Sequence, residues 1–264
     1  MKLKIYQVDA FTEQMFKGNP AAVCILTVEK SNSWLQQVAA EMNLSETAFL
    51  YPKENCYKLR WFTPEREVNL CGHATLASAH VLWEQGAVKE DKRISFQTKG
   101  GHLTAQKNND WIELNFPLEP EKETEVPDKL LESLDVTPKY IGKNCFDYLI
   151  EVESEQIVKG LKPNFNLLQD VKTRGVIVTS ASNSQKYDFV SRFFAPRVGV
   201  NEDPVTGSAH CCLGAYWQKR FAKKDFLAYQ ASQRGGIIKV QVCDNERVIL
   251  GGQATTVLEG EIRE

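Results

Sequence analysis

The sequence predicts an α+β protein made of two similar halves, in each of which mostly antiparallel strands surround one helix. An ordered set of motifs occurs twice. The first set runs from Leu59-Arg60-Trp61-Phe62-Thr63-Pro64 through a charged turn to a helix that opens with Gly72-His73-Ala74. The second runs from Ser191-Arg192-Phe193-Phe194-Ala195-Pro196 through a charged turn to a helix that opens with Gly207-Ser208-Ala209. Self-similarity of this kind is typical of duplication.

The two helices of the repeat carry small residues on one side, which lets the surrounding backbone approach them closely. The helix from Gly72 to Glu84 and the helix from Gly207 to Phe221 share this property. The small residues are Ala74, Ala77, Ser78 and Ala79 in the first, and Ala209, Cys211, Cys212 and Gly214 in the second. A sheet wrapped around each helix would explain the pattern.

Alternation and turn residues predict the remaining elements. The predicted strands are residues 3–9, 21–28, 46–51, 57–63, 93–98, 101–107, 110–116, 147–152, 175–179, 188–194, 236–243, 246–251 and 255–262. Further helices are expected at 32–42 and 128–134. The acidic, proline-containing stretch 117–127 is the best linker candidate. We therefore expect an N-terminal half at 1–116 and a C-terminal half at 128–264.

Composition excludes several classes of protein. The net charge of −2 gives no electrostatic footprint for nucleic acid or an anionic membrane. The N-terminus alternates like a strand and lacks the apolar core of a signal peptide. The seven scattered cysteines indicate reduced thiols in a cytoplasmic protein, and no histidine or cysteine pair has the spacing of a structural metal site. We expect no metal.

Two helix N-termini are candidate anion sites. Gly72 and Gly207 each open a helix whose first N–H groups lack partners within the helix, and such an end attracts a carboxylate. Both ends would point into one cleft if the halves faced each other. The alternative is that these glycines only cap packed helices, with Ser208 as an N-terminal capping residue.

Glu46 is the candidate proton-transferring residue. It opens a strand that is otherwise apolar, Ala48-Phe49-Leu50. Desolvation at such a place raises the pKa of a carboxyl group, as a general acid or base near neutral pH requires. The alternative is a solvated glutamate at a strand start.

Asp203 and His73 are further polar candidates. Asp203 precedes a helix, so it either caps that helix or turns the chain, or else it holds His73 or a substrate hydroxyl in position. His73 lies next to a helix N-terminus, which should disfavour its protonated form and suit a neutral donor and acceptor.

Cys71 also precedes a helix N-terminus, where the pKa of a thiol can be lowered. A two-base racemase would need a matching thiol in the second half. The equivalent stretch Asp203-Pro204-Val205-Thr206-Gly207 has none. This disfavours a paired-thiol mechanism.

Together these segments resemble the PhzF-like phenazine-biosynthesis family, which shares the two-domain fold of diaminopimelate epimerase. The resemblance covers residue 3 to about residue 260, and 117–146 match least. The matching motifs are Val8-Asp9-Ala10-Phe11, Gly18-Asn19-Pro20-Ala21-Ala22-Val23, Asn43-Leu44-Ser45-Glu46-Thr47-Ala48-Phe49, Arg60-Trp61-Phe62-Thr63-Pro64, Cys71-Gly72-His73-Ala74-Thr75 and Glu202-Asp203-Pro204-Val205-Thr206-Gly207-Ser208-Ala209.

The resemblance implies two barrel-like halves, each wrapped around a central helix, with the active site between them. It implies that Glu46 moves a proton between carbons of the substrate, without a cofactor, as in isomerisation of a dihydro-hydroxyanthranilate. A homodimer is a further expectation from the family. The implied catalytic positions are Glu46, His73, Asp203 and Ser208. The implied substrate-binding positions are Gly72, Gly207, Cys71 and Asn19.

Three functions stay open at this point. The first is the isomerase, acting on a small carboxylate-bearing metabolite. The second is a racemase or epimerase that works through Cys71. The third is a non-catalytic protein that binds a metabolite, since fold does not fix function.

Overall fold

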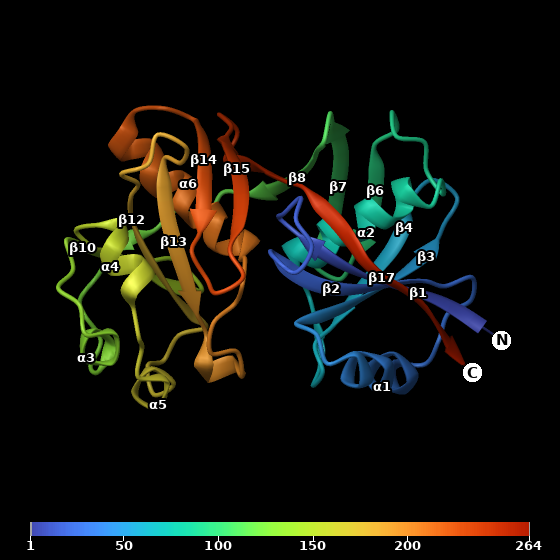
Figure 1. Ribbon diagram of the computed structural model, residues 1–264, viewed down its shortest axis with the longest axis horizontal. Helices are drawn as coiled ribbons and strands as arrows, with labels where there is room; N and C mark the ends of the chain where they lie inside the picture. The colour runs from blue at the N-terminus through green and yellow to red at the C-terminus, as the bar shows by residue number, and fades with distance from the viewer. Residues whose placement is uncertain (1, 264) are drawn as a thin grey trace. The chain divides into compact units, whose positions relative to one another are not determined.

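The computed structural model describes residues 2–263, which divide into two compact units (Figure 1). The first unit contains residues 1–116 and 251–264, and the second contains residues 117–250. Each is α+β, with one long helix among its strands, as the sequence predicts. None of the helices in the described part of the chain is long and apolar enough to cross a membrane.

The first unit begins and ends with paired strands. Its elements are β1 (Lys2–Ala10), β2 (Asn19–Ile25), α1 (Asn32–Met42), β3 (Glu46–Pro52), β4 (Tyr57–Phe62), β5 (Glu67–Val68), α2 (Gly72–Glu84), β6 (Ile94–Thr98), β7 (Gly101–Asn108), β8 (Trp111–Pro117) and β17 (Ala254–Arg263). β2 and β3 are parallel, as are β4 and β6, while β1 pairs antiparallel with both β2 and β17.

The second unit repeats part of this order. Its elements are β9 (Lys122–Glu123), α3 (Leu130–Leu134), β10 (Tyr140–Lys143), β11 (Asp147–Glu151), α4 (Glu155–Gly160), α5 (Phe165–Leu168), β12 (Gly175–Ala181), β13 (Phe189–Phe194), a 3₁₀ turn (Pro196–Val198), α6 (Gly207–Phe221), β14 (Asp225–Gln230), β15 (Gly236–Val242) and β16 (Arg247–Gly252). β11 and β12 are parallel, and β12 pairs antiparallel with β13.

The repeat read from the sequence has a structural counterpart. In the first unit the parallel pair β2 and β3 is followed by antiparallel β4 and then α2. In the second, the parallel pair β11 and β12 is followed by antiparallel β13 and then α6. Thr47 pairs with Phe62 in the first ladder, and Val176 pairs with Phe194 in the second. The two phenylalanines of the Phe-x-Pro motifs therefore occupy equivalent registers.

α2 is a central helix, in contact with β1, β2, β3 and β17. It is buried along most of its length, including Thr75 and Ser78. The Thr75 hydroxyl donates to the Cys71 carbonyl at 2.5 Å and the Ser78 hydroxyl to the Ala74 carbonyl at 2.6 Å. Each bond reaches the carbonyl of the residue four positions earlier and gives a buried hydroxyl group a partner. Burying these two polar side chains therefore costs little stability.

Two boundaries differ from the sequence-based expectation. The sequence places 128–264 in the C-terminal half, whereas residues 251–264 lie in the first unit because β17 pairs with β1 along its length. The sequence makes 117–127 a linker, whereas β9 within it pairs with β10 and the neighbouring Glu121 is buried. The strands β10 and β14 and the helices α4 and α5 were not expected from the pattern.

Candidate active site

Three polar side chains meet in the first unit, at the edge where β2, β3 and α2 all begin. Asn19 is the first residue of β2, Glu46 the first of β3, and His73 the second of α2. Because β2 and β3 are parallel, their first residues lie at the same edge of the sheet. The fold thus brings together residues that are far apart in sequence.

A glycine makes the start of β2 possible. Gly18 has a φ of +63°, and a Cβ there would lie 2.1 Å from the carbonyl oxygen of Ala10. Glycine alone adopts this conformation without steric cost. The motif Gly18-Asn19-Pro20 therefore delivers Asn19 to the strand start.

His73 is the centre of the cluster and is almost completely buried, with 5% of its surface exposed. Its Nε2 lies 3.1 Å from Oε2 of Glu46. Its Nδ1 lies 3.2 Å from Nδ2 of Asn19 and 3.6 Å from Sγ of Cys71. The imidazole ring thus separates the carboxylate on one side from the thiol and amide on the other.

Glu46 Oε2 and His73 Nε2 are both buried, and neither makes a hydrogen bond to any residue within 2–263. The two atoms lie 3.1 Å apart, but they are not oriented to form a hydrogen bond with each other. A buried polar atom without a hydrogen bond is rare and is often found at a functional site. The Glu46 oxygen therefore keeps a lone pair available for a proton.

The electrostatics of His73 differ from the expectation. Burial alone would lower the pKa of His73, but the neighbouring Cys71 and Glu46 groups raise it well above its ordinary value. The sequence predicts a neutral imidazole because of the helix N-terminus. The carboxylate 3.1 Å away reverses that prediction, since an opposite charge within about 4–6 Å favours the protonated form.

Cys71 is held as a thiol. Burial first, and then the Glu46 charge, raises its pKa to about 11. The sequence left open a lowered thiol pKa at the helix start, and the apolar surroundings oppose it. Glu46, Cys71 and His73 lie close enough to be considered for a metal ion. However, Cys71 faces Nδ1 of the ring and Glu46 faces Nε2, so one ion would reach all three only after the side chains turn.

The remaining predicted residues form a separate cluster in the second unit. The Thr206 hydroxyl donates to Asp203 Oδ2 at 2.5 Å. The fully buried Gln230 donates from Nε2 to the Asp203 carbonyl at 2.7 Å and accepts from the Thr206 N–H at 2.9 Å. Asp203 is therefore fixed in a tight turn before α6, one of the alternatives left open by the sequence.

Ser208, the second residue of α6, contacts a residue that the sequence does not single out. Arg174 donates from Nη2 to Ser208 Oγ at 3.0 Å and forms a two-pronged ion pair with the buried Asp147. Arg174 precedes β12 by one residue, and Asp147 is the first residue of β11. Nothing in the local sequence marks Arg174; its position before the second parallel strand of the repeat was the available signal.

A family model described as phenazine biosynthesis-like protein matches residues 8–260. The chain belongs to this PhzF family. The match spans both units, and it agrees with the motif set found in the sequence.

Relatives of this PhzF protein match it over its full length. An uncharacterised isomerase of Halalkalibacterium halodurans is 59% identical over 99% of both chains, and one of Pseudomonas aeruginosa is 44% identical over 99% of both. A crystal structure of a PhzF-family phenazine biosynthesis protein from Enterococcus faecalis superposes with a TM-score of 0.94, at 40% identity and complete coverage of both chains. The chain is therefore an enzyme of the isomerase type.

The diaminopimelate epimerase-like fold predicted for the PhzF protein is confirmed by its structural neighbours. A predicted epimerase from Pseudomonas aeruginosa has a TM-score of 0.77 at 19% identity, which shows a shared fold alone. The roles assigned to individual residues stay predictions.

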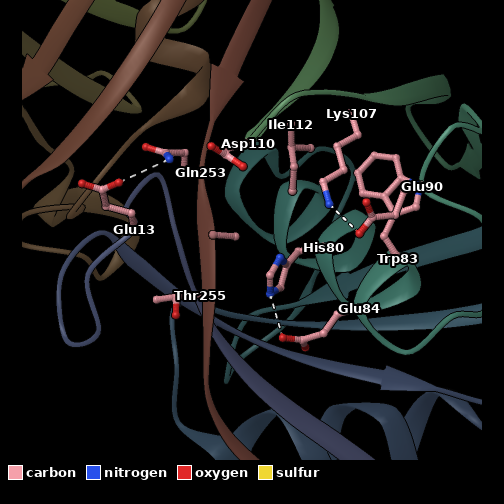
Figure 2. A pocket seen from close by; sticks show the side chains of 11 residues that line it. Glu13, His80, Trp83, Glu84, Glu90, Lys107, Asp110, Ile112, Gln253 and Thr255 are labelled. Atoms are coloured by element: carbon pink, nitrogen blue, oxygen red, sulfur yellow. Dashed lines mark hydrogen bonds and ion pairs between the residues drawn. The ribbon is translucent and has the colours of Figure 1, made fainter.

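A pocket of about 310 Å³ lies elsewhere in the first unit (Figure 2). It adjoins the C-terminal part of α2, and none of the predicted site residues lines it. His80 Nε2 lies 3.4 Å from Glu84 Oε1, and Lys107 pairs with Glu90 at 2.7 Å. These four side chains thus already have partners on the protein.

Proposed function

We propose that this PhzF-family protein is a cofactor-independent isomerase that moves a proton within a small carboxylate-bearing metabolite, with Glu46 as the general acid and base. The observation that carries the proposal is the pair of buried, facing atoms Glu46 Oε2 and His73 Nε2, neither of which has a hydrogen bond within residues 2–263. The substrate class we propose is a dihydro-hydroxyanthranilate, a cyclic allylic acid.

The proposed reaction balances without an oxidant or reductant. Glu46 takes a proton from one substrate carbon, and the electron pair of that C–H bond shifts along the neighbouring double bond. The carboxyl group then returns the proton to another carbon of the same system. The product keeps the composition of the substrate, and Glu46 ends as the carboxylate with which it began. Proton transfer by a positioned side chain contributes typically 10²–10⁴-fold to the rate.

His73 supports the role of Glu46 in proton transfer. Its raised pKa keeps a positive charge 3.1 Å from the Glu46 carboxylate. Asn19 is fully buried and contacts the far nitrogen of the ring, so it acts on His73 in this structure. Direct substrate contact by Asn19 stays a prediction.

The helix N-termini support binding of an acid. Neither α2 nor α6 has a hydrogen-bonding side chain as its N-cap. The N–H groups that open each helix can therefore serve a carboxylate oxygen. We propose Gly72 and Gly207 for this backbone role, with His73, Asp203 and Ser208 as polar groups of the site.

Two observations disfavour the Cys71 racemase. The Cys71 thiol has a pKa raised to about 11, which is unsuited to a base at neutral pH. Its counterpart before α6 is Thr206, which carries no thiol.

The test compares Glu46→Gln with Glu84→Gln. Glu84 is a matched control because it also faces a histidine, His80, on the same helix α2. We expect the wild-type protein and Glu84→Gln to isomerise dihydro-hydroxyanthranilate, followed by proton NMR, and Glu46→Gln to be slower by at least about 10²-fold. Wild-type turnover by Glu46→Gln would reject the assigned residue, and no conversion by the wild-type protein would reject this substrate class.

A further inference from the structure

The side chain at the second position of each central helix contacts a charged residue at the start of a parallel strand. In the first unit His73 of α2 faces Glu46, which opens β3. In the second unit Ser208 of α6 receives a hydrogen bond from Arg174, directly before β12. β3 and β12 are equivalent strands of the repeat, because each is parallel to its predecessor and antiparallel to its successor. The first unit thus carries a carboxylate at this strand start, and the second carries a guanidinium one residue earlier in the register.

Arg174 is held rigidly in place. Its Nε donates to Asp147 Oδ1 at 2.8 Å and its Nη2 to Asp147 Oδ2, and Asp147 is fully buried. Its guanidinium carbon lies 4.9 Å from the centre of the Phe146 ring and 5.8 Å from that of Phe193. A two-pronged ion pair and cation–π contacts together restrain a guanidinium group.

The fixed guanidinium determines whether the Ser208 hydroxyl donates or accepts hydrogen bonds. A hydroxyl has one proton to donate and lone pairs that accept. Arg174 can only donate, so Ser208 Oγ is the acceptor in their 3.0 Å bond. No residue in the described part of the chain accepts the Ser208 hydroxyl proton. That proton is therefore available to an external acceptor.

The backbone around Ser208 presents further donors. The N–H groups of Gly207, Ser208 and Ala209 have no hydrogen-bond acceptor within residues 2–263, because α6 has no side-chain cap. The Thr206 hydroxyl, which precedes them, is directed to Asp203. Several donors without acceptors at one place match an anionic oxygen.

We propose that Arg174, anchored by Asp147, is a positioning residue that makes Ser208 a hydrogen-bond donor to a carboxylate oxygen of the substrate. This inference rests on the proposed function for its substrate class. It goes beyond that function in assigning to Arg174 and Asp147 a part in recognising the acid.

The test is a double-mutant cycle on anion binding, measured by isothermal titration calorimetry with benzoate and with its neutral counterpart benzamide. We expect benzoate to bind the wild-type protein more tightly than benzamide does. Ser208→Ala and Arg174→Gln should each weaken benzoate binding on the order of tenfold. The double variant Arg174→Gln/Ser208→Ala should bind no more weakly than Ser208→Ala alone, because Arg174 acts through Ser208.

Two further variants separate positioning from stability. Arg174→Gln leaves the Asp147 charge buried and unpaired, so Asp147→Asn/Arg174→Gln, which removes both charges, is measured beside it. Arg60→Met breaks a comparable two-pronged pair with Glu67 in the first unit and should leave benzoate binding unchanged. Asp147→Asn/Arg174→Gln should fold and still bind benzoate as weakly as Ser208→Ala.

Additive losses of benzoate affinity in the double variant would overturn the proposal. Wild-type affinity for benzoate in both Arg174 variants would also overturn it. So would equal affinity of the wild-type protein for benzoate and benzamide. The two proposals stay distinguishable because the binding cycle uses no turnover. Failure of Glu46→Gln to slow turnover would leave the Arg174 binding result standing, and failure of the binding cycle would leave the turnover result standing.

Discussion

His73 Nε2 lies 3.1 Å from Glu46 Oε2, and the contact joins the N-terminus of α2 to the start of β3. The carboxylate changes the expected behaviour of the histidine. A helix N-terminus disfavours an imidazolium ion. Here the neighbouring Cys71 and Glu46 groups outweigh the effect of the helix N-terminus, and the pKa of His73 is raised. The contact is therefore an ion pair in which the Glu46 carboxylate favours the protonated form of His73.

The first prediction concerns this pair. NMR titration of the His73 ring should give a pKa above its ordinary value of about 6.5, and Glu46→Gln should lower it, because the charge that favours protonation is gone. His80 is an internal control, since burial first, aided by Lys107, lowers its pKa despite Glu84. The two histidines of α2 should shift in opposite directions.

The same shift has a consequence for stability. A raised folded-state pKa means that the folded protein binds the proton more tightly than the unfolded chain. The contribution of His73 to the free energy of unfolding is therefore complete below about pH 6.5 and is lost as the pH rises through the folded-state pKa. Urea unfolding of the wild-type protein and His73→Gln should differ most at the acid end of this range. A difference that grows with pH would contradict the assignment.

The sequence predicts the polar residues of each unit but not all the contacts that make them work. Phe62 and Phe194 reveal the repeat, and the extents of α2 and α6 follow from small residues and the glycines that open them. Arg174 lies 34 residues before Ser208, and only the parallel pairing of β11 with β12 brings Asp147 and Arg174 together. Pairing between distant strands is not encoded in local alternation.

β17 shows the same limit at the level of the fold. Its alternating pattern predicts a strand, yet the choice of β1 as partner joins residues 254–263 to 2–10. A strand pattern specifies which face is buried but not which neighbour completes the sheet. This is why the C-terminal segment is assigned to the second half from sequence and lies in the first unit.

The second prediction concerns Cys71. At neutral pH a thiol of pKa about 11 is ionised in roughly one molecule in 10⁴, and Cys71 is also buried. Iodoacetamide should therefore modify the exposed Cys145 well before Cys71, as followed by mass spectrometry of the digested protein. Cys71→Ser should keep most of the isomerase activity. Loss of activity in step with Cys71 alkylation would instead support the racemase.

The third prediction concerns acid stability of the second unit. His210 is fully buried, and burial lowers its pKa to about 4 despite its contact with the Thr206 carbonyl at 2.8 Å. The unfolded chain takes up the proton near pH 6.5, whereas the folded protein does so only near pH 4. The stability from His210 is thus present above about pH 6.5 and is lost as the pH falls towards 4.

A shift of this size corresponds to about 3 kcal/mol of the free energy of unfolding. His210→Asn, whose amide can still donate to a carbonyl, should flatten the fall in stability between these pH values in urea unfolding. His102, which lies in the exposed part of β7, provides the control variant His102→Asn. An equal acid-induced loss in the wild-type protein and His210→Asn would rule out His210 as the cause.

The fourth prediction concerns the glycine that follows Arg174. A Cβ at Gly175 would lie 2.2 Å from the ring of Phe193, which also makes a cation–π contact with the Arg174 guanidinium. Gly175→Ala should displace the ring and cost about 1–3 kcal/mol of stability, the usual range for overpacking. Gly160, where a Cβ meets nothing within 4 Å, gives the control Gly160→Ala. Because the displaced ring supports Arg174, benzoate affinity should fall in Gly175→Ala and not in Gly160→Ala. Unchanged melting temperature and unchanged affinity in Gly175→Ala would show that Phe193 moves freely and that its ring does not hold the guanidinium in place.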